Sequence, residues 1–147
     1  MIIKLKIIFL FSVSLFFGCK SKEIKQTESG FWILENQTGG IAGRNITEAD
    51  RGYSVKLILC NNGKFYQLKN DSISEQGTYS IGNGKSIYQK EAQRIISLSS
   101  GKKLVVMKIN ATEMELAENY YDGFGFSYLR TKSFKIKKIP FQKGKNP

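Results

Sequence analysis

The chain has no histidine and only 2 cysteines and 2 prolines among its 147 residues. It therefore lacks the commonest general base of enzymes and the commonest metal ligand of proteins. Neither a catalytic triad nor a cluster with metal-ligand spacing can be assembled from the other residues. The neighbouring carboxylates, such as Asp71 with Glu75 and Glu113, Glu115 and Glu118, fall near turns or at outward positions, where solvated charge is ordinary. We predict no enzyme activity, no metal site and no cofactor.

Very long hydrophobic runs are also missing. The longest hydrophobic run of the chain lies at its amino terminus. Residues 7–17 are apolar except for two serines, follow Lys4 and Lys6, and precede Gly18 and Cys19. A membrane-spanning helix needs roughly twenty apolar residues, and this run is too short for one. A basic start, a short apolar core and a small residue at its end are typical of a secretory signal peptide. We predict that residues 1–18 are removed on export.

The segment that ends at Gly18 and Cys19 resembles the lipobox of bacterial lipoproteins, in which a small residue precedes an acylated cysteine. Two phenylalanines before Gly18 depart from the usual pattern, and an ordinary signal peptide with a chance cysteine is the alternative. The resemblance implies a membrane partner, because each buried methylene contributes about 0.8 kcal/mol to anchoring. By the same resemblance, Lys20 favours the outer membrane, with the protein facing the periplasm or the cell surface.

The mature chain then holds one further cysteine, Cys60, so no intramolecular disulfide forms. With no histidine to lower its pKa, we interpret Cys60 as a small buried apolar side chain rather than a nucleophile. Residues 19–29 are mainly polar and are assigned to the acylated amino terminus and a linker.

Positive charge is abundant, with 23 Lys and Arg against 12 Asp and Glu, but it is concentrated at the chain ends. Residues 130–147 hold seven basic residues and no acidic one, whereas residues 30–129 hold 11 basic and 10 acidic residues. A nucleic-acid-binding domain would carry a basic surface on its folded part, and we therefore predict no nucleic-acid partner. Residues 132–147 form a basic tail that lies on an anionic membrane or is a solvated chain end.

After residue 29, short apolar and β-branched runs alternate with turns that contain glycine or asparagine. This pattern predicts an all-β fold, either a sandwich or a closed up-and-down barrel, and closure is favoured because it removes exposed sheet edges. The long connection from Asn36 to Gly52 is expected to form a lid or rim, with Thr47 capping one helical turn. The predicted strands, about eight in number, lie near 31–35, 53–60, 64–69, 75–81, 86–90 continuing into 94–98, 103–110, 113–118 and 124–132.

Gly30-Phe31-Trp32 resembles the G-x-W opening of lipocalins, and Tyr128-Leu129-Arg130 resembles its closing partner. With the segments 39–43, 77–79, 84–88 and 121–124, these motifs are similar to a group of small lipocalin-like lipoproteins of Gram-negative bacteria. The resemblance covers residues 30–131 and implies an antiparallel, up-and-down, eight-stranded lipocalin-like β-barrel. Strand parity points Trp32 and Arg130 into one end of the barrel, where we expect a cation–π contact to close it.

Strand alternation also selects the side chains that face the barrel interior. Tyr66 and Leu68 do not fit the alternation, so the register of the strand at 64–69 is the least well determined. The inward set comprises Leu57, Leu59, Phe65, Tyr79, Ile81, Ile96, Leu98, Val105, Met107, Ile109, Met114 and Leu116. The candidate ligand-binding residues are Leu57, Phe65, Tyr79, Met107, Leu116, Phe126 and Tyr128.

An eight-stranded barrel is just wide enough to be filled by its own side chains or to hold one small ligand. The sequence leaves both hypotheses open. In the first, the chain is a lipid-anchored cell-envelope lipoprotein whose barrel binds a small apolar molecule. In the alternative, the barrel is filled and the chain is a non-catalytic protein–protein interaction module that contacts an envelope partner.

Overall fold

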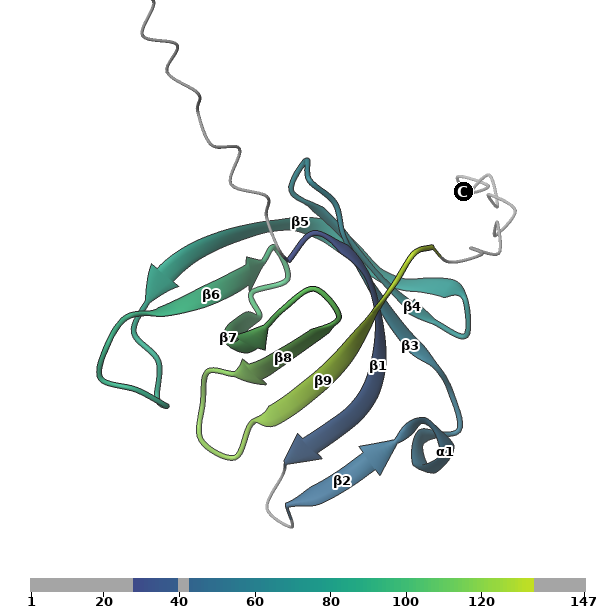
Figure 1. The fold of residues 1–147 in the computed structure, drawn as a ribbon, viewed down its shortest axis with the longest axis horizontal. Helices are drawn as coiled ribbons and strands as arrows, with labels where there is room; N and C mark the ends of the chain where they lie inside the picture. Colours follow the sequence, from purple (N-terminus) through teal and green to yellow (C-terminus); the bar gives the residue numbers. More distant parts are fainter. Residues whose placement is uncertain (1–27, 40–42, 134–147) are drawn as a thin grey trace, which may run out of the picture.

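The computed structural model describes residues 28–39 and 43–133. The predicted signal peptide, the predicted acylation site Cys19 and most of the predicted linker and tail lie outside these residues. The described residues form one helical turn and nine strands of a single antiparallel sheet that curves round on itself (Figure 1). The elements are β1 (Gly30–Gly39), β2 (Arg44–Thr47), α1 (Glu48–Arg51), β3 (Val55–Leu59), β4 (Lys64–Lys69), β5 (Ser72–Gly84), β6 (Gln93–Leu98), β7 (Lys103–Ile109), β8 (Glu113–Glu118) and β9 (Phe124–Thr131).

Eight of these strands, all except β2, close into an up-and-down barrel. Each pairs with its neighbour in the chain, and β1 pairs with both β3 and β9. The β1–β9 seam runs from Phe31 opposite Thr131 to Gly39 opposite Phe124. The predicted eight-stranded antiparallel barrel is confirmed, and the sandwich is excluded because the first and last strands are hydrogen-bonded to each other.

The connection between β1 and β3 is more regular than predicted. β1 continues to Gly39, and its second half pairs with β2, from Asn36 opposite Thr47 to Gly39 opposite Arg44. The polar sequence of this hairpin lacks the apolar alternation that identifies a strand. The helical turn at Thr47 is present: Asp50 N–H donates to Thr47 Oγ1 over 3.4 Å, and Thr47 N–H donates to the Asp50 carboxylate over 2.8 Å.

The strand predicted at residues 86–90 is absent, which is a correction to the sequence interpretation. The chain forms a loop between β5 and β6, in which the Ser86 hydroxyl oxygen accepts hydrogen bonds from the backbone N–H groups of Tyr88 and Gln89. The Tyr88 hydroxyl donates to the carbonyl oxygen of Glu118 over 2.8 Å. Local serine hydrogen bonds of this kind compete with a strand ladder.

A β-bulge in β7 overturns two of the predicted inward positions. The pairing with β8 shifts between Val106 and Lys108, so that Met107 is an additional residue in its strand. Met107 is 43% exposed, and Leu104 and Val106, rather than Val105, belong to the interior cluster. The additional residue inverts the alternation of inward and outward side chains beyond it. Ile109 therefore packs against the interior cluster, as predicted, although it lies three residues after Val106.

The interior cluster collects alternate residues from the barrel strands. In β4, Phe65 belongs to the interior cluster. Leu68 is fully buried but is not a member of this cluster. These positions determine the register of β4, which the sequence left undetermined. The buried members are Trp32, Leu34, Leu57, Leu59, Phe65, Tyr79, Ile96, Leu98, Leu104, Met114, Leu116 and Tyr128.

Candidate functional site: a cavity in the barrel

One end of the barrel is closed by Trp32 and Arg130, and we call this end the floor. The two residues are directly opposed in the β1–β9 seam, and the Arg130 guanidinium carbon lies 4.2 Å from the centroid of the Trp32 ring. The expected cation–π contact is therefore present. Gly30 allows this approach, since its φ is 150° and an added Cβ would lie 2.7 Å from Arg130 Nη1.

The floor includes two residues that the sequence assigned to the linker. Trp32 Nε1 donates to the carbonyl oxygen of Glu28 over 2.8 Å, and Arg130 Nη1 donates to that of Ser29 over 2.9 Å. The Glu28 side chain is fully buried and forms an ion pair with Arg94. The folded unit thus begins at least two residues before the predicted boundary at Gly30.

Two of the candidate ligand-binding residues belong to the packed core instead. Phe65 is buried in the interior cluster, and neither Phe65 nor Tyr79 lines the cavity described below. The Tyr79 hydroxyl donates to the carbonyl oxygen of Cys60 over 2.8 Å. Cys60 itself is only partly buried, in contrast to the buried position expected for it.

A cavity of about 420 Å³ occupies the other part of the barrel. Gln37 and Phe124, which lie at the end of the β1–β9 seam opposite the floor, line it and place its mouth at that end. This volume lies within the range of roughly 300–1,000 Å³ that is typical of small-molecule sites. Its apolar wall consists of Leu34, Val55, Leu57, Leu59, Ile96, Leu98, Leu104, Leu116, Phe124, Phe126 and Tyr128.

Four of the seven candidate ligand-binding residues line this cavity: Leu57, Leu116, Phe126 and Tyr128. Met107 does not, because the bulge turns it to the solvent. Burial raises the pKa of the Tyr128 hydroxyl well above its usual value, and the nearby positive charge of Arg51 opposes this shift in part. The phenol is consequently a neutral polar group on an otherwise apolar wall.

The mouth of the cavity is polar and carries three cationic side chains, Arg51, Lys69 and Lys102. Arg51 donates from Nη1 to the carbonyl oxygen of Ile46 over 2.9 Å and from Nη2 to that of Leu34 over 3.2 Å. Lys69 Nζ lies 3.8 Å from the centroid of the Tyr53 ring. The sequence pattern missed these residues because they lie on α1, at the end of β4 and in a turn, where basic side chains normally face the solvent.

Glu118 is the one carboxylate among the residues that line the cavity. It is buried, and its Oε2 accepts hydrogen bonds from Phe124 N–H over 3.0 Å and from the Tyr120 hydroxyl. The bond to Glu118 is the main reason why the pKa of Tyr120 is raised. Glu118 does lie next to a turn, at the end of β8, but the solvated position expected for its charge is wrong. Its shared parity with Met114 and Leu116 was the signal that could have placed its side chain inside.

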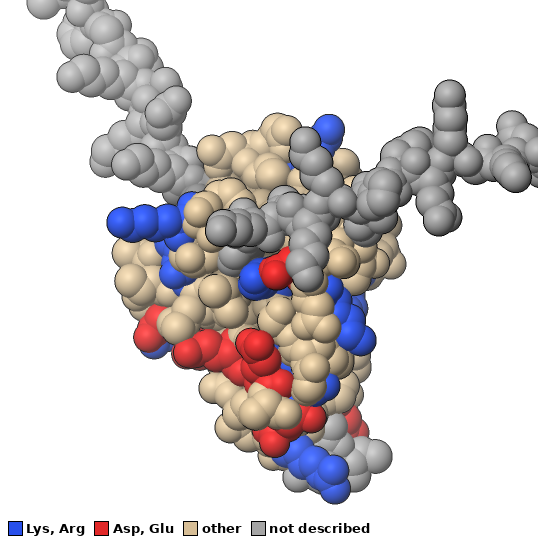
Figure 2. Space-filling view, turned by 90° about the vertical axis from the view of Figure 1, so that its right-hand side faces the viewer, with Lys and Arg blue, Asp and Glu red and all other residues tan. Residues whose placement is uncertain are grey.

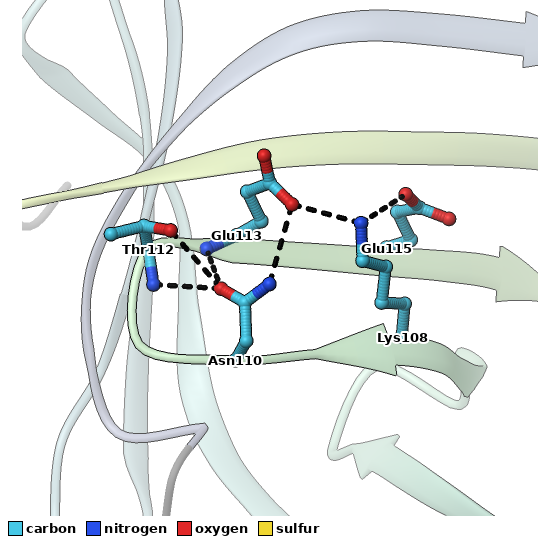
Figure 3. Close-up of polar contacts among 5 residues, drawn as sticks. All are labelled: Lys108, Asn110, Thr112, Glu113 and Glu115. Atoms are coloured by element: carbon cyan, nitrogen blue, oxygen red, sulfur yellow. Dashed lines mark hydrogen bonds and ion pairs between the residues drawn. The ribbon is translucent and has the colours of Figure 1, made fainter.

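The carboxylates at the β7–β8 turn belong to a separate surface cluster, shown in Figure 3. Lys108 Nζ lies 2.9 Å from Glu113 Oε2 and 3.7 Å from Glu115 Oε1, and all three side chains are about half exposed. The hydrogen bond from Lys108 lowers the pKa of Glu113, and a second one from Asn110 adds to this effect. These groups form solvated ion pairs, as the sequence predicts, and they do not line the barrel cavity.

Charge on the barrel surface is mixed in sign. On the face shown in Figure 2, Asp and Glu side chains gather across the lower half, and Lys and Arg side chains lie in separate groups around them rather than forming one continuous basic surface. Among the described residues, no three side chains of Cys, Asp and Glu are arranged to hold a metal ion. The described part of the chain contains no helix with the length and apolar character needed to cross a bilayer.

Comparison with known proteins adds no family to this description. No protein-family model, no curated protein and no solved structure matches the chain significantly.

Proposed function

We propose that this chain is an exported cell-envelope lipoprotein whose lipocalin-like barrel binds one small apolar or amphipathic molecule. The observation that carries the proposal is the cavity of about 420 Å³, which has an apolar wall and a polar mouth. Apolar walls with a few polar groups that fix orientation are typical of small-molecule sites. The alternative of an interaction module with a filled barrel fits this interior less well.

The location is proposed from the amino terminus, where a short apolar run precedes Gly18 and Cys19. Acylation of Cys19 would tether the barrel to the outer membrane without a spanning segment, facing the periplasm or the cell surface. An apolar molecule that partitions into a bilayer would then be within reach of the barrel. We propose no catalytic step, cofactor or nucleic-acid partner.

Filling the cavity is expected to abolish ligand binding. Leu116 lines the cavity and is 1% exposed, so that the larger side chain of Leu116→Trp enters the free volume. We expect this variant to bind N-phenylnaphthylamine, an uncharged fluorophore that brightens in apolar sites, at least about tenfold more weakly than the unaltered chain.

The matched control is Met107→Trp, which adds the same indole at an exposed position. It is expected to bind the fluorophore as the unaltered chain does. Circular dichroism verifies that both variants keep the β-sheet. Equal fluorophore binding by the folded Leu116→Trp variant would show that the probe does not occupy the cavity and would contradict the proposed function.

Removing the acylated cysteine is expected to release the protein from membranes. In cells that express the full chain, Cys19→Ala should move most of the protein from the membrane pellet to the soluble fraction, because acyl chains provide the anchoring free energy. Cys60→Ala changes the other cysteine and should leave the protein in the pellet. Retention of Cys19→Ala in the pellet after a high-salt wash would exclude acylation as the sole anchor.

A further inference from the structure

Arg51 has unused hydrogen-bonding capacity inside the cavity. Its guanidinium donates from Nη1 to the carbonyl oxygen of Ile46 and from Nη2 to that of Leu34, which leaves a second N–H on each of these two nitrogens. A guanidinium group has five N–H donors in a planar fork that matches a carboxylate. Among the described residues, no carboxylate lies within ion-pair distance of Arg51.

The charged residues around Arg51 determine which kind of group fits beside these N–H donors. The cavity is lined by Arg51, Lys69 and Lys102, against the single carboxylate of Glu118. Glu118 already accepts hydrogen bonds from Phe124 N–H and the Tyr120 hydroxyl. The charge at the mouth is therefore net positive, and a negative group placed there would be attracted.

The apolar wall begins directly next to this cation. Arg51 Nη2 donates to the carbonyl oxygen of Leu34, and the Leu34 side chain lines the cavity together with Leu57 and Phe126. The positive charge of Arg51 also acts on the buried hydroxyl of Tyr128, two residues from Phe126 on the same strand. A ligand that reaches Arg51 with its charged group thus has apolar surface available for the rest of its length.

We propose that the ligand is a single-chain amphiphile with an anionic head group, which pairs with Arg51 while its alkyl chain occupies the apolar part of the cavity. This inference rests on the proposed function, because it names the class of molecule that the same cavity binds. Arg51 fixes the head group at the mouth, and Lys69 and Lys102 add attraction without a fixed contact.

Two probes of equal chain length test this proposal: dodecanoate, which carries a carboxylate, and dodecanol, which is neutral. Each displaces N-phenylnaphthylamine from the purified full chain, and Leu116→Trp provides the correction for binding outside the cavity. We expect dodecanoate to bind at least about tenfold more tightly than dodecanol, since hydrogen bonds to charged groups are among the stronger ones.

The variant Arg51→Met assigns that preference to one residue. It should lower the affinity for dodecanoate about tenfold or more and lower the affinity for dodecanol by much less, so that the preference for dodecanoate is lost. Arg44→Met removes an exposed arginine from β2, which does not line the cavity, and is expected to change neither affinity. Circular dichroism establishes that both variants are folded.

The outcomes separate this inference from the proposed function. Equal binding of dodecanoate and dodecanol to the unaltered chain would overturn the anionic ligand class and leave the proposed apolar site standing. An unchanged dodecanoate affinity in folded Arg51→Met would overturn the role of Arg51. Failure of both probes and of the fluorophore to bind would instead contradict the proposed function. If Arg51→Met does not fold, Arg51→Lys, which keeps the charge but loses the planar fork, should still weaken dodecanoate more than dodecanol.

Discussion

Replacing Trp32 with alanine is expected to lower the free energy of unfolding by about 3–5 kcal/mol. Trp32 is fully buried in the interior cluster. The substitution removes the largest side chain at the floor and leaves the Arg130 guanidinium without the ring on which it lies. It also removes the donor to the carbonyl oxygen of Glu28. The barrel would lose packing at the point where its first and last strands meet.

Urea unfolding followed by far-ultraviolet circular dichroism measures this change, because the chain has no second tryptophan to serve as a fluorescent reporter. Tyr121→Ala is the control: Tyr121 is 81% exposed, and its loss should change the free energy of unfolding by no more than about 0.5 kcal/mol. Trp32→Phe should fall between the two. A loss of less than about 1 kcal/mol in Trp32→Ala would mean that the contact between Trp32 and Arg130 does not hold the barrel closed.

Replacing Gly39 with alanine is expected to lower the free energy of unfolding by about 2–4 kcal/mol, through backbone strain and a steric clash. Gly39 has a φ of +129°, a conformation that side chains of L-residues rarely adopt. An added Cβ would lie 2.5 Å from the carbonyl oxygen of Gly123 and 3.1 Å from Cα of Phe124. Both atoms belong to the backbone, so that the clash is relieved only by moving β1 and β9 apart.

Gly82→Ala is the matched control, because an added Cβ there meets no atom within 4 Å. We expect it to leave the free energy of unfolding unchanged or to raise it by up to about 1 kcal/mol. Urea titrations of the two variants provide the comparison. If Gly39→Ala unfolds at the same urea concentration as Gly82→Ala, this result would contradict the close approach of β1 and β9 at this end of the seam.

The sequence alone determined the class of fold and the way in which it closes. Period-two alternation and turn residues are local signals, and they placed most of the barrel strands without any knowledge of their neighbours. The pairing of Trp32 with Arg130 was implied by the resemblance to lipocalin motifs, and strand parity showed that both side chains can point into the same end of the barrel. The helical turn at Thr47 was predictable for the same reason, since its capping hydrogen bonds involve residues three apart.

Only the tertiary structure decided which residues line the cavity. The bulge at Met107 leaves the pattern of apolar residues intact while it exchanges the faces of β7, so alternation could not place that side chain. Arg51 lies on a helical turn, and hydrogen bonds to the carbonyl oxygens of Ile46 and Leu34 hold its guanidinium at the cavity. The cavity is the volume that remains between side chains from many strands, and it depends on how those strands are arranged around the barrel. No local pattern of residues determines that volume, and for this physical reason the sequence left both a filled barrel and a hollow one open.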